Sequence, residues 1–196
     1  ITLPLAEAGV AGISGPRGEV REAARALTVQ LATHHSPHDV KLVVVYPHEE
    51  AEHWAWMRWL PHVWSQDRER RYLASHAEAA HELLELIHQD LKDRKQRLES
   101  RDGLVVGTPI PNWVFLLAAP KLVCDEPIYP LLLKQAKDLG AYSLFLSDLP
   151  GDLPKQCERF VRLAETPPIL AEDVAGTDAV PYKPDLAPLQ DTQTFG

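Results

Sequence analysis

The stretch from residue 10 to residue 20, VAGISGPRGEV, comes nearest of any part of this sequence to a chemical site. It predicts a short buried strand, a glycine-rich turn and the start of a helix. A phosphate-binding loop occurs in the same context with the spacing G-x-x-x-x-G-K-[S/T], because backbone N–H groups and a helix N-terminus together attract an anion. The stretch is therefore a candidate phosphate site.

The residues that would carry out the chemistry are replaced. Gly12 matches the first glycine and Gly15 lies within the turn, but Arg17 stands where the second glycine belongs. Gly18 takes the place of the lysine, and Glu19 that of the magnesium-binding hydroxyl. A carboxylate at a helix N-terminus interacts favourably with the helix dipole but repels a phosphate. We expect the loop architecture to be kept and its chemistry lost, although an arginine could still hold an anion.

A nucleotide site also needs an acid that organises magnesium, expected at the end of the strand beside the loop. The apolar run 113–117 predicts that strand, and Ala118 and Ala119 follow it, neither of which can bind a metal or orient a water. Asp125 and Glu126 come later. They are either displaced acids or loop and helix-capping residues, since a proline typical of a first helical position follows them. Loss at two separate places indicates that hydrolysis is absent.

Other catalytic and metal-binding patterns do not occur in the sequence. His48 and His53 are five positions apart, whereas the zinc-peptidase helix motifs place two histidines four apart. There is no G-x-S-x-G nucleophile motif. We expect the nine histidines to be scattered over the surface, Cys124 to be a packed residue, and no metal to be bound.

Four of the five tryptophans, Trp54, Trp56, Trp59 and Trp64, fall within eleven positions. One interpretation is an apolar cluster that covers an edge of the sheet. The other is a docking surface, because aromatic residues dominate interface hot spots. Since a short helix cannot turn every ring inward, we expect some of these rings to be buried and at least one to be partly exposed.

Composition and charge describe an ordinary globular chain. It has 196 residues, of which 45% are hydrophobic and 24% charged, with a formal charge of −8 that argues against nucleic-acid binding. Two cysteines suggest a reducing compartment, and no apolar run approaches the length of a membrane span. The sequence starts at Ile1 and ends in a polar tail, so we expect a piece of a longer protein.

Hydrophobic periodicity predicts alternating strands and helices. Expected strands are 10–14, 40–46, 72–73, 112–117, 141–146, 158–164 and 180–182; expected helices are 20–33, 49–59, 76–98 and 128–139.

The longer strands are apolar on both faces, which favours a mainly parallel sheet with 10–14 central between 113–117 and 141–146. The predicted fold is a three-layer α/β domain with helices on both faces, similar to P-loop NTPases but with degenerate motifs. We expect this domain to cover 1–170, and 171–196 to be an extension.

The sequence resembles the first, divergent ATPase-like module of the EssC/EccC coupling proteins of bacterial type VII secretion. The similarity covers nearly the whole chain. It is carried by GISGPRGEV, by ARALTVQLATHHSPHDVKLVVV ending at residue 45, by WAWMRWLPHVW at 54–64, by the strand at 113–117 and by PYKPDL at 181–186.

The resemblance implies a membrane-anchored protein with several FtsK/SpoIIIE-like domains, in which this module follows the membrane segments on the cytoplasmic face of the bacterial membrane. Later domains would carry the intact motor motifs and recognise small helical secreted substrates. The family's catalytic residues cannot be transferred, because the matching positions hold Gly18, Glu19, Ala118 and Ala119.

We therefore expect a pseudo-ATPase, a structural and regulatory module with weak or absent binding of ATP and magnesium. Its expected partners are other domains of the same coupling protein, type VII secretion membrane components and secreted substrates, with no nucleic acid. Two alternatives stay open. One is a working ATPase with a non-standard nucleotide site that borrows acids from a neighbouring subunit, and the other is a substrate-recognition module built on the tryptophan cluster.

Overall fold

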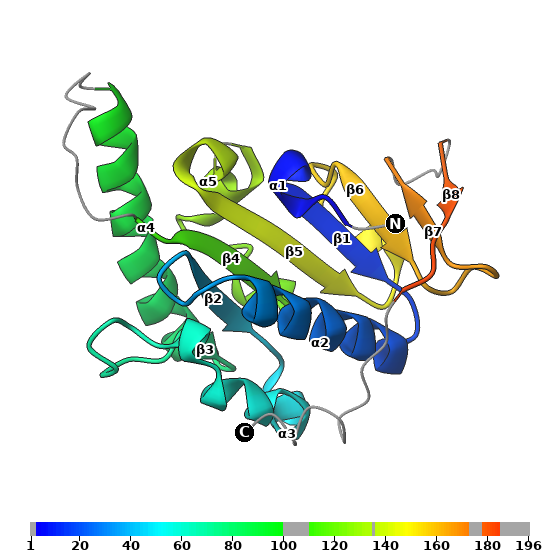
Figure 1. Ribbon diagram of the computed structural model, residues 1–196, viewed down its shortest axis with the longest axis horizontal. Helices are drawn as coiled ribbons and strands as arrows, with labels where there is room; N and C mark the ends of the chain where they lie inside the picture. The colour runs from blue at the N-terminus through cyan, green and yellow to red at the C-terminus, as the bar shows by residue number, and fades with distance from the viewer. Residues whose placement is uncertain (1–2, 100–109, 135, 173–177, 185–196) are drawn as a thin grey trace.

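The computed structural model describes residues 3–99, 110–134, 136–172 and 178–184. They form a sheet of eight strands in the order β3-β2-β4-β5-β1-β6-β7-β8, with helices on both faces (Figure 1). The predicted three-layer α/β architecture is confirmed.

Six strands are parallel and two are antiparallel. The parallel strands are β1 (Val10–Ser14), β2 (Val40–Val45), β3 (Leu73–Ala74), β4 (Asn112–Leu117), β5 (Ala141–Ser147) and β6 (Arg159–Arg162). At one edge, β7 (Ile169–Ala171) and β8 (Val180–Pro181) pair antiparallel. The predicted edge strand near residue 180 is therefore present, and β7 lies on both sides of the domain boundary expected after residue 170, which stays a prediction.

The neighbours of β1 differ in part from the sequence prediction. Strand β1 lies between β5 and β6, so the expected neighbour 141–146 is correct. The expected neighbour 113–117 is wrong, because β4 pairs with β2 and β5. Two-sided burial makes all of these strands apolar and cannot by itself determine which of them lie next to each other.

The described α-helices are α1 (Leu5–Ala8), α2 (Arg17–His34), α3 (Ala51–Trp54), α4 (Ala77–Glu99) and α5 (Tyr129–Lys134). Helix α2 covers one face of the sheet, where Val20, Ala23 and Ala24 are buried in the same core as Ile13 and Leu144. Helices α4 and α5 cover the other face (Figure 1). None of the helices in the described part of the chain is long and apolar enough to cross a membrane.

Three helices differ from their predicted extents, and the helix predicted at 128–139 is the shorter α5 followed by a 3₁₀ segment, Ala136–Leu139. Helix α2 begins at Arg17, three residues before the predicted start, after Pro16 as its N-cap residue. The predicted helix 49–59 consists of α3 between two 3₁₀ segments, His48–Glu50 and Ala55–Trp59. The earlier start of α2 places Arg17 in its first turn, beside the ends of the central strands.

Candidate functional site: a closed phosphate-loop position

The connection between β1 and α2 is a turn of two residues, Gly15 and Pro16. The Gly15 N–H donates to the Ser147 carbonyl over 3.3 Å, and proline has no N–H. The turn itself therefore offers no N–H group to an anion. A phosphate would meet only the first turn of α2, whose N–H groups lack partners within the helix.

Packing explains two of the loop glycines but not the third. A Cβ on Gly12 would lie 2.6 Å from Leu153 Cδ1, and one on Gly15, whose φ is 146°, would lie 2.9 Å from Leu163 Cβ. A Cβ on Gly18 would meet nothing within 4 Å. The fold would therefore accommodate a side chain at the position of the phosphate-binding lysine, so the lack of a lysine there is not a steric requirement.

The Arg17 guanidinium is held by groups of the protein itself. Its Nε donates to Glu50 Oε1 over 2.6 Å and its Nη2 to Glu50 Oε2 over 3.0 Å, which forms a bidentate pair. Nη2 also donates to the Ala118 carbonyl over 3.1 Å, and Nη1 lies 3.7 Å from Asp148 Oδ1. The cation expected to attract a phosphate is thus already bound.

Glu50 provides the anion at this helix N-terminus. Besides Arg17, its carboxylate accepts hydrogen bonds from Arg21 Nη1 over 3.4 Å and from Trp54 Nε1 over 3.2 Å. Burial raises the pKa of Glu50, but the hydrogen bonds from Arg17 and Trp54 and the two arginine charges outweigh it and leave the pKa below its ordinary value. The carboxylate therefore stays charged near neutral pH.

A cavity of about 750 Å³ lies beside this ion pair, at the edge of the sheet where the parallel strands end. Its charged lining comprises two cations, Arg17 and Lys121, and four carboxylates. The four are Glu49, Glu50, Asp148 and Asp152. This excess of carboxylates over cations repels a nucleoside triphosphate, which is itself negatively charged.

The predicted site residues divide into those at this cavity and those away from it. Ala118 and Ala119 line it, and Gly18 and Glu19 are exposed on the first turn of α2. Glu126 instead pairs with His81 Nδ1 at 2.9 Å and is not part of the lining. Asp125, the other candidate for a displaced acid, is exposed and does not line the cavity either.

Sequence reasoning missed the two carboxylates that contact Arg17, Glu50 and Asp148. Asp148 directly follows β5, which was correctly predicted to lie beside β1, so a search for an acid at the end of that strand as well as after 113–117 would have identified it. No comparable signal existed for Glu50, which lies 33 positions from Arg17.

The tryptophan cluster is partly core and partly surface. Trp54 is 2% exposed and Trp56 8%, whereas Trp59 is 64% exposed and Trp64 is half-buried. This is the mixture expected for a short helix. The docking role stays a prediction.

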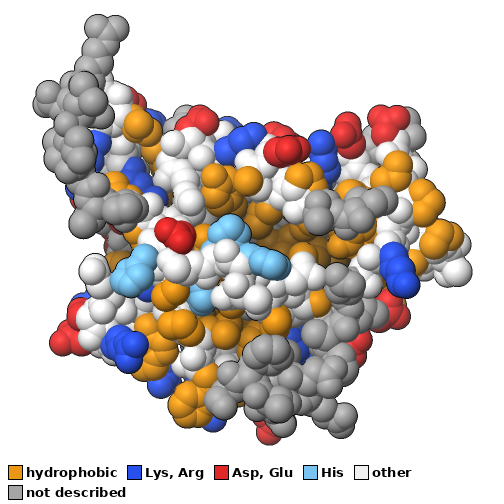
Figure 2. Space-filling view, in the orientation of Figure 1, with side chains coloured by type: hydrophobic (Ala, Val, Ile, Leu, Met, Phe, Trp, Pro, Cys, Tyr) orange, Lys and Arg blue, Asp and Glu red, His pale blue; other side chains and the backbone are white. Residues whose placement is uncertain are grey.

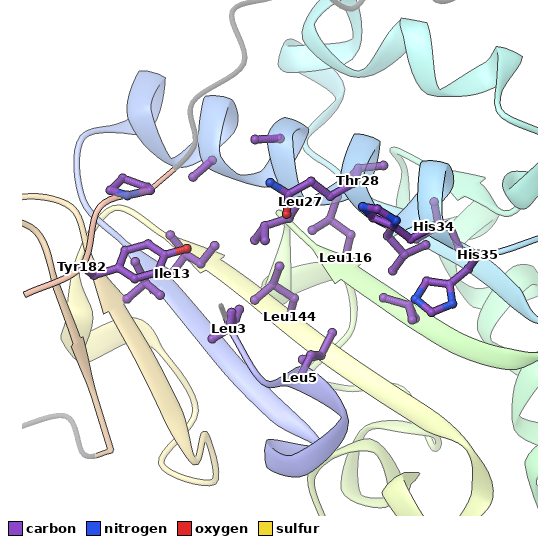
Figure 3. Close-up of a pocket in the computed structure, with 18 residues that line it drawn as sticks. Leu3, Leu5, Ile13, Leu27, Thr28, His34, His35, Leu116, Leu144 and Tyr182 are labelled. Atoms are coloured by element: carbon purple, nitrogen blue, oxygen red, sulfur yellow. The ribbon is translucent and has the colours of Figure 1, made fainter. Parts of the chain in front are cut away.

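A second cavity, of about 360 Å³, lies between α2 and the sheet (Figure 3). Leucines from the N-terminal segment, the helix and the sheet point into it, with Tyr182 at one end and His34 and His35 at the other (Figure 3). The Thr28 hydroxyl, which also lines it, donates to the Ala24 carbonyl over 2.8 Å. The lining is therefore mostly apolar.

His62 should make stability depend on pH. It is 2% exposed, its Nε2 donates to the His35 carbonyl over 2.8 Å, and its Nδ1 has no partner in the described structure. Burial, together with Lys41 and the His35 ring, lowers its pKa below 6.5 despite that hydrogen bond. The unfolded chain therefore binds the proton more readily, and we expect stability to fall as the pH drops below about 6.5.

The measurement is urea unfolding of the wild type and of His62→Gln from about pH 7.5 to about pH 5. Glutamine keeps an N–H donor but does not titrate. The difference in free energy of unfolding between the wild type and the variant should therefore shrink as the pH falls. His81, whose pKa is raised by Glu126, works in the opposite direction and cancels because both proteins contain it. Parallel curves would contradict this role of His62.

The fold is shared with solved structures of ATPase domains from secretion proteins. The chain superimposes on Thermomonospora curvata EccC (ATPases 2 and 3) in complex with a signal sequence peptide with a TM-score of 0.63 and 17% identity, covering 82% of this chain and 32% of that one. For EssC (ATPases 2 and 3) from Geobacillus thermodenitrificans the TM-score is 0.64 at 10% identity, covering 86% and 38%.

The chain is homologous to the ATPase domains of the EccC, EssC and YukB proteins of type VII secretion. It is 28% identical over 154 residues to the ESX secretion system protein EccC of Geobacillus thermodenitrificans, and 28% identical over 173 residues to YukB of Bacillus subtilis. These matches cover 79% and 83% of this chain but only 10% of each relative. No protein-family model matches the chain.

Proposed function

We propose that this chain is a non-hydrolysing ATPase-like module of a type VII secretion coupling protein, which links the membrane complex to the motor domains during export. The module would act on the cytoplasmic side of the cell membrane. Its partners would be other domains of the same protein and membrane components of the secretion system. Since it spans a tenth of its relatives, it would contribute one part of a larger machine.

The observation that carries this proposal is the pairing of Arg17 with Glu50 at the N-terminus of α2, where a phosphate-binding loop would hold its phosphate. The turn before α2 adds no N–H donor, and the cavity beside it has more carboxylates than cations. The lysine and the hydroxyl are absent from the matching positions, and Asp148, the acid that follows the strand beside the loop, lies 3.7 Å from the Arg17 guanidinium. Each feature weakens nucleotide binding in a different way, and together they favour a structural role.

Calorimetric titration with Mg-ATP and a phosphate-release assay test the enzymatic half of the proposal. We expect the wild type to bind with a dissociation constant weaker than about 1 mM and to show no turnover. Glu50→Gln should bind Mg-ATP measurably more tightly, because Arg17 and Arg21 lose their counter-charge, but should still not hydrolyse it. Glu49→Gln is the matched control, since that carboxylate forms no bond to Arg17 in the structure.

Turnover by pure wild-type protein that disappears in Arg17→Ala would contradict the proposal and favour an ATPase with a non-standard site. The structural half is tested in the host bacterium. Arg17→Ala should leave secretion intact if the module is not an enzyme, whereas deletion of the whole module should abolish it.

A second candidate function, recognition of a secreted substrate, is favoured by the apolar cavity between α2 and the sheet. The structural neighbour from Thermomonospora curvata, solved with a signal sequence peptide, makes the same ligand class reasonable here. Titration of a labelled substrate peptide would test it. Leu27→Trp places a bulky ring in the cavity and should abolish binding of the peptide. Leu149→Ala, at an exposed position, should leave it unchanged.

A further inference from the structure

One corner of the molecule combines arginine and tryptophan side chains. It comprises the end of the 3₁₀ segment Ala55–Trp59 and the hairpin that follows, which stands out from the edge of the sheet beyond β3 (Figure 1). Basic and hydrophobic side chains lie next to each other in this region of the surface (Figure 2). We call it the Arg–Trp corner, formed by Arg58, Trp59, Trp64, Arg68, Arg70 and Arg71.

Specific contacts hold the corner together. The Arg58 guanidinium lies 5.0 Å from the centre of the Trp59 ring, and the Arg71 guanidinium 4.3 Å from that of Trp64. The Trp64 indole N–H donates to the Arg58 carbonyl over 3.1 Å, and Trp64 and Arg71 form a β-bridge. Both cation–ring pairs therefore belong to one surface.

The tip of the hairpin presents a further cation. Ser65 N–H donates to the Arg70 carbonyl over 2.9 Å, and the Arg68 N–H to the Ser65 carbonyl over 3.0 Å. Arg68 has a φ of 60°, a left-handed conformation that glycine adopts with less strain. Asp67 accepts hydrogen bonds from the Ser65 hydroxyl and the Glu69 N–H, so its carboxylate is engaged within the hairpin.

The chemistry of this corner matches a negatively charged interfacial surface. The corner and its hairpin carry four arginines and two carboxylates, Asp67 and Glu69, and the adjoining cavity adds Lys41 and Asp39, which leaves a local excess of positive charge on a chain with a formal charge of −8. Exposed charges are screened beyond about 8–10 Å, so the corner acts largely independently of the distant acidic surface. Trp59 adds a ring that is 64% exposed, and indole partitions to the boundary between water and lipid.

We propose that the Arg–Trp corner docks on a membrane surface that contains anionic phospholipids. The guanidinium groups bind the lipid phosphates, for which their planar donor pairs are suited, and the Trp59 ring enters the headgroup layer. A fluid lipid surface needs no matching shape, which suits a protruding hairpin better than an acidic protein face does. Neither hydrolysis nor its absence is required for this interaction.

Co-sedimentation of the 196-residue chain with vesicles tests the proposal. We expect binding to phosphatidylcholine vesicles that contain phosphatidylglycerol and little binding to phosphatidylcholine alone. Arg68→Gly removes one charge and should lower vesicle binding about fivefold, the effect expected for one arginine near an anionic membrane. Because glycine also relieves the backbone strain at this position, such a loss of binding would not reflect unfolding. Trp59→Ala should also lower binding several-fold. Lys155→Gln and Leu149→Ala remove an exposed cation and an exposed hydrophobic side chain elsewhere and should change nothing.

Vesicles containing brominated phosphatidylcholine provide a second readout, because bromine quenches the fluorescence of nearby tryptophan. Quenching should occur in the wild type and fall markedly in Trp59→Phe, with Trp64, the other ring of the corner, accounting for what remains. The proposal is overturned if the wild type does not prefer anionic vesicles, if the control variants lose as much binding as the corner variants, or if Trp59→Phe is quenched as strongly as the wild type. If the wild type binds no vesicles, the lipid proposal fails and an acidic protein surface becomes the alternative partner of the corner.

Discussion

Truncation of Trp54 to Ala should lower the free energy of unfolding by about 3–5 kcal/mol, because it removes a fully buried ring and leaves a cavity. Trp54 is 2% exposed, its ring lies 6.1 Å from that of Tyr46, and its N–H binds Glu50. Trp59→Ala, at a 64% exposed ring five positions away, should change stability by less than about 0.5 kcal/mol.

Urea unfolding of single alanine variants of all four clustered tryptophans provides the measurement. Trp54→Phe separates the two contributions at that position, since it keeps much of the ring volume but loses the hydrogen bond to Glu50. Equal destabilisation by all four variants would mean that the cluster is only core. The docking interpretation of Trp59 should then be dropped.

Arg94→Met is expected to lower the free energy of unfolding by about 2–4 kcal/mol, because it removes a buried guanidinium that pairs with the partly exposed Asp90 and donates to two carbonyls. Arg94 is 8% exposed and lies 2.8 Å from Asp90 through Nε. Its Nη1 donates to the Leu139 carbonyl over 3.1 Å and its Nη2 to the Pro111 carbonyl over 2.9 Å. It thereby joins α4 to the segments that lead into β4 and β5, and its loss leaves these acceptors without a donor.

Lys92→Met is the matched control, because it removes an exposed cation from the same helix. A double-mutant cycle with Asp90→Asn isolates the pairwise contribution, since the two groups are in contact. If Arg94→Met lowers the free energy of unfolding no more than Lys92→Met does, this role of Arg94 is contradicted. Water would then satisfy the Leu139 and Pro111 carbonyls.

The class of fold could be predicted from local sequence, whereas the loss of nucleotide chemistry stays a prediction. Continuous apolar runs and helical spacing depend on near neighbours in the chain, and they identified β1, β2, β4, β5, α2 and α4. The replacement of lysine by Gly18 and of the hydroxyl by Glu19 is likewise visible without a structure. The start of α2 was predicted three residues too late, because the apolar periodicity begins at Val20 whereas the helix begins directly after Pro16.

The contents of the site were decided by the tertiary structure. The β1–β5 pairing brings Asp148 toward Arg17, and the segment after β2 places Glu50 at the N-terminus of α2. The segment containing α3 turns Trp54 inward and leaves Trp59 in solvent. Periodicity determines which face of an element is apolar because that pattern is local. Strand neighbours, and residues that meet across 33 positions of sequence, depend on how all the apolar faces pack together at once.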